Sequence, residues 1–182
     1  KEVHFDAEHF FDGFSANKKY AISIVKEAMA AGADWVVLCD TNGGCMPDQV
    51  RETIESLIEE GIDSSKLGIH AHNDTENAVA NSLAAVQAGV RQIQGTLNGL
   101  GERCGNANLI SLLPTLLLKP QFAEKFVTGV TSDSLKEITR ASRIMDDVLN
   151  RVPNRFAPYV GSSAFAHKAC LLYTSDAADE HG

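Results

Sequence analysis

The chain of 182 residues is 44% hydrophobic and 22% charged, the balance of one soluble globular domain. Its formal net charge of −8 argues against nucleic acid or an anionic membrane as the main partner. It contains no stretch long and apolar enough to cross a bilayer, and we expect a cytoplasmic protein. Four cysteines without a CxxC pair indicate reduced thiols rather than a disulfide scaffold.

Short apolar runs in the first hundred residues predict four buried strands, at residues 3–5, 35–39, 67–71 and 92–96. Helical spacing between these runs predicts three helices, at about residues 18–31, 47–61 and 73–89. Pro47 favours the start of the second helix, and a glycine follows or ends each of the three. The recurrence of strand and helix is typical of repeated βα units with parallel strands.

Repeated βα units form either an open doubly wound sheet or a (β/α)₈ barrel. The first strand is not followed by the glycine-rich loop of a nucleotide-binding open sheet, which favours the barrel. Polar residues cluster after each strand, where a barrel carries its catalytic groups. We therefore predict an α/β fold, a partial TIM (β/α)₈ barrel of about four units. Residues 131–150 predict one further helix with Ser134 and Glu137 as a capping box.

Two histidines stand one residue apart at the end of the third predicted strand. Because side chains alternate along a strand, His70 and His72 point to the same face and are able to bind one divalent cation. The alternative is an ordinary histidine pair on a half-exposed strand. Asn106, in a glycine-rich loop, is a candidate third ligand, although an asparagine before a helix is also a common N-cap. Such a donor set suits Mg²⁺, Mn²⁺ or Zn²⁺, and it lacks a carboxylate.

One residue after the first predicted strand and one after the second are candidates for acting on a substrate. Glu8 lies on the same side of its strand as His4 and Asp6, so it is a candidate general base, with a solvated turn carboxylate as the alternative. Thr41 is a candidate hydrogen-bond donor to a substrate carboxylate or keto oxygen, with a plain turn role as the alternative. We do not expect a cysteine to act as nucleophile.

Three motifs carry a family resemblance: DTNGG (residues 40–44), HAHND (70–74) and GERCGN (101–106). Together they resemble the metal-dependent Claisen-condensing enzymes of the isopropylmalate synthase family. The segments DAEHFFDG (6–13) and GNANL (105–109) look most similar to its citramalate synthase branch. The resemblance covers about residues 1–168. It implies that residues 1–120 are the C-terminal half of a TIM-barrel catalytic domain, the last four βα units, and that residues 121–168 begin a helical linker. Residues 169–182 do not match, and we interpret them as an artefact of sequencing or assembly.

The resemblance also implies a reaction. In this family a divalent metal, with acetyl-CoA as co-substrate, supports condensation with a 2-keto acid; pyruvate would give citramalate for isoleucine biosynthesis. His70 and His72 match the family's histidine ligands and Asn106 a more distant ligand. Thr41 matches a residue that contacts the keto acid, and Glu8 an acidic residue near the reacting carbons. The full-length enzyme is expected to be a homodimer.

The chain also departs from the family pattern. The Asp-Arg-Glu motif that supplies an aspartate ligand and a catalytic arginine is absent. The alternatives are a fragment of an isopropylmalate or homocitrate synthase, or a truncated product that at most binds metal. We expect the isolated chain to be inactive and, because a half-barrel leaves two sheet edges unpaired, to oligomerise.

Overall fold

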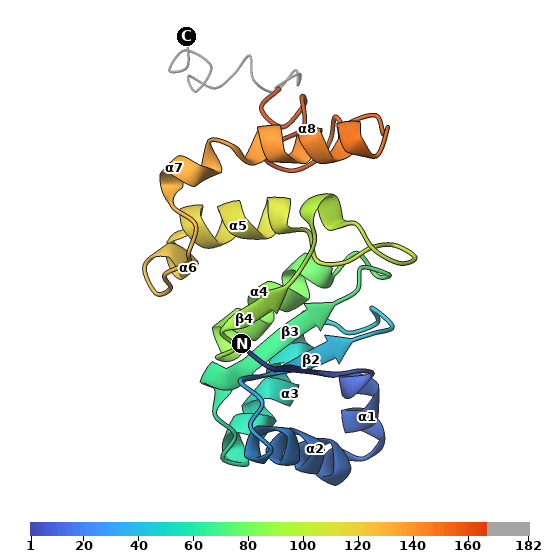
Figure 1. Ribbon diagram of the computed structural model, residues 1–182, viewed down its shortest axis with the longest axis vertical. Helices are drawn as coiled ribbons and strands as arrows, with labels where there is room; N and C mark the ends of the chain where they lie inside the picture. The colour runs from blue at the N-terminus through green and yellow to red at the C-terminus, as the bar shows by residue number, and fades with distance from the viewer. Residues whose placement is uncertain (167–182) are drawn as a thin grey trace, which may run out of the picture.

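The computed structural model describes residues 1–166, so the predicted foreign tail at 169–182 lies outside the described residues. The described residues form a parallel sheet in the order β1-β2-β3-β4 (Figure 1). The strands are β1 (His4–Ala7), β2 (Trp35–Asp40), β3 (Leu67–Ala71) and β4 (Gln92–Gln94). The predicted α/β class with four parallel strands is therefore confirmed, and the arrangement is that of a partial TIM barrel.

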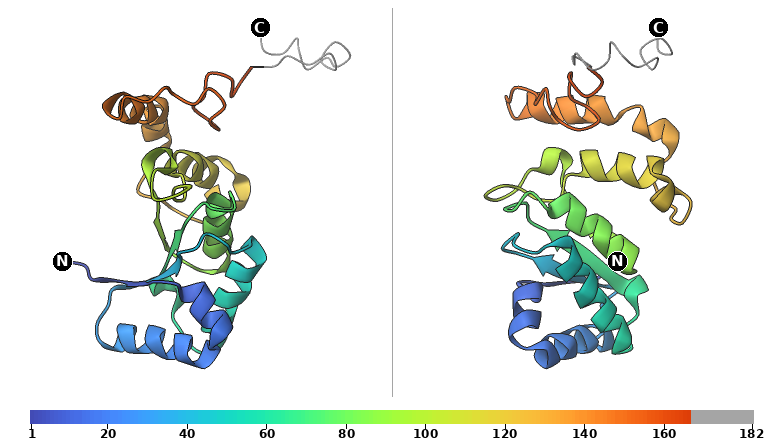
Figure 2. Two further views of the ribbon diagram at one scale, coloured as in Figure 1. Left: turned by 90° about the vertical axis from the view of Figure 1, so that its right-hand side faces the viewer. Right: turned by 180° about the vertical axis from the view of Figure 1, so that it is seen from behind.

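Helices cover one face of this sheet. They are α1 (Phe10–Ala16), α2 (Lys18–Ala30), α3 (Pro47–Glu59) and α4 (Ala78–Ala88). In the left view of Figure 2, α3 and α4 lie to the right of the strands and α2 lies below them. The core consists of alternate strand residues, such as Leu38 and Ile69, packed with Ile54 and Leu57 of α3. Their alternation leaves the intervening strand residues on the opposite face.

On the opposite face of the sheet, polar side chains of β1, β3 and β4 meet across the strands, whereas β2 contributes the apolar Val37 and Cys39. Gln92 Nε2 of β4 lies 3.2 Å from His4 Nδ1 of β1, although two strands separate them. Strands are spaced about 4.8 Å apart, so this contact requires the sheet to curl strongly, as it does in a barrel. Gly68 of β3 makes room for it, because a Cβ there would collide with Gln92 Oε1.

Two helix predictions differ from the structure near the ends of strands. Helix α1 was not predicted; it follows His9, which adopts a left-handed conformation at φ 54° and provides no side-chain cap. Helix α4 begins at Ala78 rather than at residue 73. Asn73 Oδ1 accepts a hydrogen bond from the Ala78 amide at 3.1 Å, while Asp74 pairs with Arg103 instead of capping.

A helical segment follows β4. It comprises η2 (Leu97–Gly99), α5 (Leu109–Leu118), α6 (Pro120–Ala123), α7 (Ser132–Leu135) and α8 (Ile138–Val148), while η1 (Ser64–Lys66) precedes β3. The single helix predicted at 131–150 is thus two helices, and the predicted capping box was wrong. Thr131 is the cap instead, because its Oγ1 accepts a hydrogen bond from the Ser134 amide at 3.2 Å. The division into residues 1–120 and 121–168 stays a prediction.

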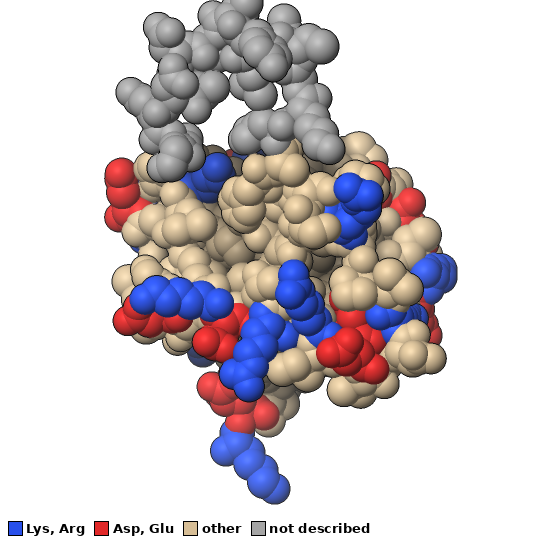
Figure 3. All heavy atoms as spheres, turned by 90° about the horizontal axis from the view of Figure 1, so that it is seen from above, with Lys and Arg blue, Asp and Glu red and all other residues tan. Residues whose placement is uncertain are grey.

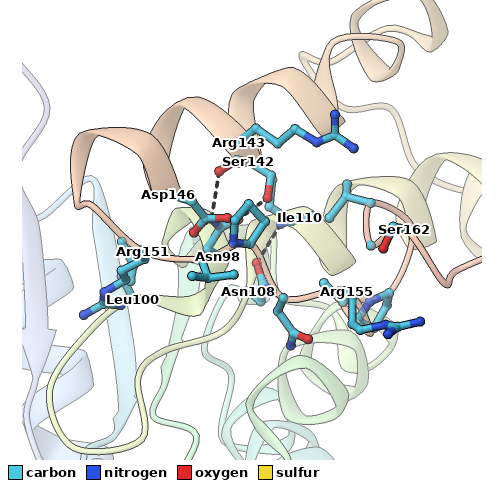
Figure 4. Close-up of a pocket in the computed structure, with 17 residues that line it drawn as sticks. Asn98, Leu100, Asn108, Ile110, Ser142, Arg143, Asp146, Arg151, Arg155 and Ser162 are labelled. Carbon is cyan, nitrogen blue, oxygen red and sulfur yellow. Dashed lines mark hydrogen bonds between the residues drawn. The ribbon is translucent and has the colours of Figure 1, made fainter.

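Helix α8 is anchored to η2 by Asn98. The Asn98 amide donates to the Ser142 carbonyl at 3.0 Å and to Asp146 Oδ1 at 2.9 Å, and its oxygen accepts from Ser142 Oγ at 2.7 Å. These residues border a cavity of about 540 Å³ between η2, α5, α8 and residues 151–162 (Figure 4).

Seen from the α8 end, the surface carries charges of both signs around a wide uncharged area (Figure 3). Over residues 1–166, no helix is long and apolar enough to cross a membrane.

Candidate functional site

The five predicted site residues all lie at the carboxyl-terminal edge of the sheet. Glu8 and Thr41 directly follow the ends of β1 and β2, while His70 and His72 lie in β3 and just after it. Asn106 lies in the loop after η2 and pairs with His72 in an isolated antiparallel bridge. The structure brings these residues together in two groups, the histidines with Asn106 and Glu8 with Thr41.

The two histidines converge through their Nε2 atoms. These nitrogens are 3.3 Å apart, and the rings are tilted by 49° with centroids 5.0 Å apart. Two nitrogen ligands at the usual zinc distance of about 2.0–2.1 Å from one tetrahedral ion lie about 3.3 Å apart. The separation of the histidine nitrogens therefore fits a shared divalent cation.

The electrostatic environment favours the neutral form of His72. Burial lowers the pKa of His72, and the neighbouring His70 and Arg103 lower it further. Its side chain is almost fully buried, and its Nδ1 has no hydrogen-bond partner among the described residues. A neutral imidazole is the form that binds metals, so this environment favours ligation over an ion pair.

Asn106 presents an unpaired oxygen. Its Nδ2 donates to the Leu100 carbonyl at 3.2 Å, whereas its Oδ1 is buried and without a partner in the described part of the chain. The N-cap alternative is wrong, because Asn108 caps α5 by accepting from the Ile110 amide at 3.0 Å. A buried amide oxygen without a partner is costly unless something binds it, so this atom fits the donor set of a cation site.

The loop that carries Asn106 depends on glycine. Gly105 has φ +92°, and a Cβ there would collide with the carbonyl oxygen of Gly99. Gly101 has φ +159°, and a Cβ there would lie 2.5 Å from Asn106 Nδ2. The chain is able to fold back tightly enough to reach β3 because side chains are absent at these positions.

Glu8 and Thr41 form a direct pair. The Thr41 hydroxyl donates to Glu8 Oε2 at 2.7 Å and accepts from the His9 amide at 2.8 Å. The hydroxyl has one proton, so a substrate oxygen that accepts it displaces Glu8 as acceptor. This geometry allows the carboxylate and the hydroxyl to act on the same substrate.

Arg103 connects the loop after β3 to the turn after β2, a role that we did not predict from the sequence. Its guanidinium makes two hydrogen bonds with the carboxylate of Asp74, at 2.8 and 2.9 Å, and also donates to the Thr41 carbonyl at 2.6 Å. The side-chain hydrogen bond from Arg103 lowers the pKa of Asp74, and the same bond raises the pKa of Arg103. The signal in the sequence was the charge pair of residues 74 and 103 after adjacent strands.

Two thiols near the site, those of Cys39 and Cys45, are partly or fully buried and have raised pKa values. Burial, followed by the charge of Glu8, raises the pKa of Cys39 to about 12, and burial followed by the charge of Asp40 raises the pKa of Cys45 to about 12. Neutral thiols are weak nucleophiles.

Residues 1–166 contain no cluster of three or more His, Cys, Asp or Glu side chains able to hold a metal, so the histidine pair and Asn106 form a partial donor set.

Comparison with known proteins places this site in a family. A model of the HMGL-like family matches residues 1–144. The chain belongs to the HMGL-like family. The match begins at residue 1 with β1 and lies in the N-terminal part of the chain, which contradicts the prediction that the chain is the C-terminal half of the catalytic barrel. The βα units of a barrel repeat one geometry, so four strands do not by themselves reveal which units they are.

Relatives of this HMGL-like chain include two kinds of synthase. It is 51% identical over 167 residues to an (R)-citramalate synthase of Aquifex aeolicus, which covers 92% of this chain and 30% of the relative. It is 37% identical over 171 residues to a 2-isopropylmalate synthase of Methylacidiphilum infernorum, with 93% of this chain and 33% of the relative covered. The chain thus spans about a third of the length of the relatives it matches.

The fold is also found in solved structures. An HMG-CoA lyase of Bacillus subtilis superimposes with a TM-score of 0.63 at 24% identity, covering 75% of this chain and 45% of the lyase. At that identity the likeness supports the partial TIM-barrel fold alone.

Proposed function

We propose that the protein containing this chain is a divalent-metal-dependent acyltransferase that condenses acetyl-CoA with a 2-keto acid, in the cytoplasm and as a homodimer. Pyruvate is the proposed acceptor and citramalate the product, a step towards isoleucine. The observation that carries the proposal is the 51% identity to an (R)-citramalate synthase across a segment that contains the converging histidines.

The proposed metal ligands are His70, His72 and Asn106. The 3.3 Å separation of the histidine nitrogens and the unpaired Asn106 oxygen support this assignment. A bound Mg²⁺, Mn²⁺ or Zn²⁺ would act as a Lewis acid that makes the keto carbon electrophilic. A carboxylate ligand would have to come from outside residues 1–166, since these residues provide no third acidic, histidine or cysteine ligand.

Thr41 is proposed to orient the keto acid, and Glu8 is proposed to take part in proton transfer. The Thr41 hydroxyl is placed to donate to an oxygen of the keto acid, and in doing so it releases the Glu8 carboxylate from their 2.7 Å hydrogen bond. A carboxylate oxygen that loses its hydrogen-bond donor is free to accept a proton from another group. Glu8 would then act as the base that takes a methyl proton from acetyl-CoA or orients the group that does.

The proposal is tested by thiol release from acetyl-CoA, measured with the full-length protein and a thiol reagent. Pyruvate should support CoA release, and removal of divalent metal with a chelator should abolish it. Replacing both histidines, H70A and H72A, should abolish divalent-ion binding measured by calorimetry, whereas the control H9A should not. Failure of every 2-keto acid to give metal-dependent release would refute the proposal, and unchanged ion affinity in the double variant would refute the ligand assignment.

A second candidate is isopropylmalate synthase, which the 37% identical relative favours. The same assay separates the two, because 3-methyl-2-oxobutanoate would then replace pyruvate as the preferred acceptor. We further expect the 182-residue chain alone to release no thiol, because its described residues supply only a partial ligand set.

A further inference from the structure

A line of hydrogen bonds on the polar face of the sheet leads to His70 from the side opposite His72. Asp6 of β1, Gln94 of β4 and His70 of β3 form this line. Gln94 Nε2 donates to Asp6 Oδ1 at 3.0 Å, and Gln94 Oε1 lies 2.8 Å from His70 Nδ1. The three residues come from three different strands, so the contact depends on the curl of the sheet.

The chemistry of Asp6 sets the direction of every bond in this line. An ionised carboxylate only accepts hydrogen bonds, so the group that Gln94 turns towards Asp6 must be its NH₂. The amide oxygen of Gln94 therefore faces His70. Because that oxygen only accepts, His70 Nδ1 must carry the proton.

The consequence lies at the other ring nitrogen. A neutral imidazole has one proton, so with Nδ1 protonated the lone pair is on Nε2, the atom that faces His72 Nε2 at 3.3 Å. We propose that Gln94, oriented by Asp6, is a positioning residue that fixes His70 in the Nδ1–H tautomer and so presents its Nε2 lone pair to a divalent cation. The inference rests on the proposed function of His70 as a metal ligand.

The chain offers a matched control on the same strand. Gln92 lies two residues earlier, on the same face of β4, and its amide contacts His4 rather than a candidate ligand. Replacing Gln92 removes a cross-sheet contact of the same kind without touching His70. A role in bracing the sheet would affect both glutamines, whereas control of the tautomer is specific to Gln94.

Binding of Mn²⁺ alone to the full-length protein, followed by the EPR signal of free Mn²⁺, measures the affinity. Loss of a group that orients a ligand histidine typically weakens metal binding by about 10- to 100-fold. We expect Q94L to fall in that range and Q92L to stay at the wild-type value. The exchanged pair D6N/Q94E should recover most of the lost affinity, because the amide introduced at position 6 would donate to the carboxylate introduced at position 94, which would in turn accept from His70. Wild-type affinity in Q94L, or no recovery in the exchanged pair, would overturn the inference.

A second measurement does not depend on metal. Magic-angle-spinning NMR of sedimented full-length protein, labelled with ¹⁵N in the histidine rings, reports which ring nitrogen carries the proton, and the spectrum of H70N assigns the signals. We expect a protonated Nδ1 at His70 in the wild-type protein, and a protonated Nε2 would overturn the inference. If the wild-type protein shows the Nδ1–H tautomer but binds no Mn²⁺, the proposed metal function fails while the hydrogen-bond line stands.

Discussion

Asp40 organises the turn after β2 that carries Thr41. Its carboxylate is 3% exposed; Oδ1 accepts from the Gly44 amide at 3.2 Å, and Oδ2 accepts from the Cys45 amide at 3.2 Å and Asn81 Nδ2 at 3.4 Å. The isosteric change D40N leaves one acceptor oxygen, so one of these two backbone donors faces an NH₂ group. A buried donor that loses a charged acceptor costs about 1.5–3 kcal/mol, which corresponds to about 10- to 150-fold in an opening equilibrium.

Amide hydrogen exchange measures this opening directly in the full-length protein. Peptides that contain residues 43–46 should exchange about 10- to 150-fold faster in D40N, because the local opening free energy falls by that amount. The control D133N removes an exposed carboxylate of α7 and should leave these peptides unchanged. Wild-type exchange at Gly44 and Cys45 in D40N would refute the view that the carboxylate holds this turn.

Three further predictions concern the core, the thiols and the glycine loop. L57A removes a fully buried side chain and should destabilise the protein by about 2–5 kcal/mol in thermal unfolding, while I58A, at a half-exposed neighbour, should have little effect. Iodoacetamide should modify the exposed Cys104 long before Cys45 at pH 8. The rate at which Cys45 is modified should rise about tenfold per pH unit, because the pKa of its thiol is about 12. Equal modification rates of the two cysteines in peptide mass spectra would contradict this. G105A should displace Asn106 and weaken Mn²⁺ binding measured by EPR, whereas G13A, in open space, should not; equal affinities would exclude a role for this loop.

The sequence predicted those parts of the fold that burial determines. The predicted runs correspond to all four strands, and β3 was predicted at its observed bounds, because a strand covered by helices must be apolar. The prediction that all four are buried was wrong for β1, which is exposed except at Ala7, and for β4, which is half-buried. It did not predict α5, whose residues are apolar except for Ser111 and Thr115 and include Pro114, so helical periodicity is hidden. The late start of α4 was also missed, because Asp74 pairs with Arg103, a residue 29 positions away that local capping rules do not consider.

The sequence predicted those site residues that lie on a single strand. It did not predict the residues that contribute through contacts between different strands. Strand alternation was enough to place His70 and His72 on one face. The role of Gln94 required knowledge of which strands lie next to each other and how far the sheet curls, because its partners are 24 and 88 positions away in the sequence. The alternation of Gln92 and Gln94 on either side of Ile93 is the feature of the sequence from which a polar face could have been predicted.

Gly68 and Gln92 are coupled by the space that they share. A side chain at position 68 would push Gln92 away from His4 and so remove one of the contacts that join β1 and β4. Among homologous sequences, a larger residue at position 68 should therefore occur together with a shorter one at position 92. The two positions should covary as a pair, although neither is a proposed ligand or catalytic group. The sizes of the residues at these two positions would then indicate how strongly the sheet is curved.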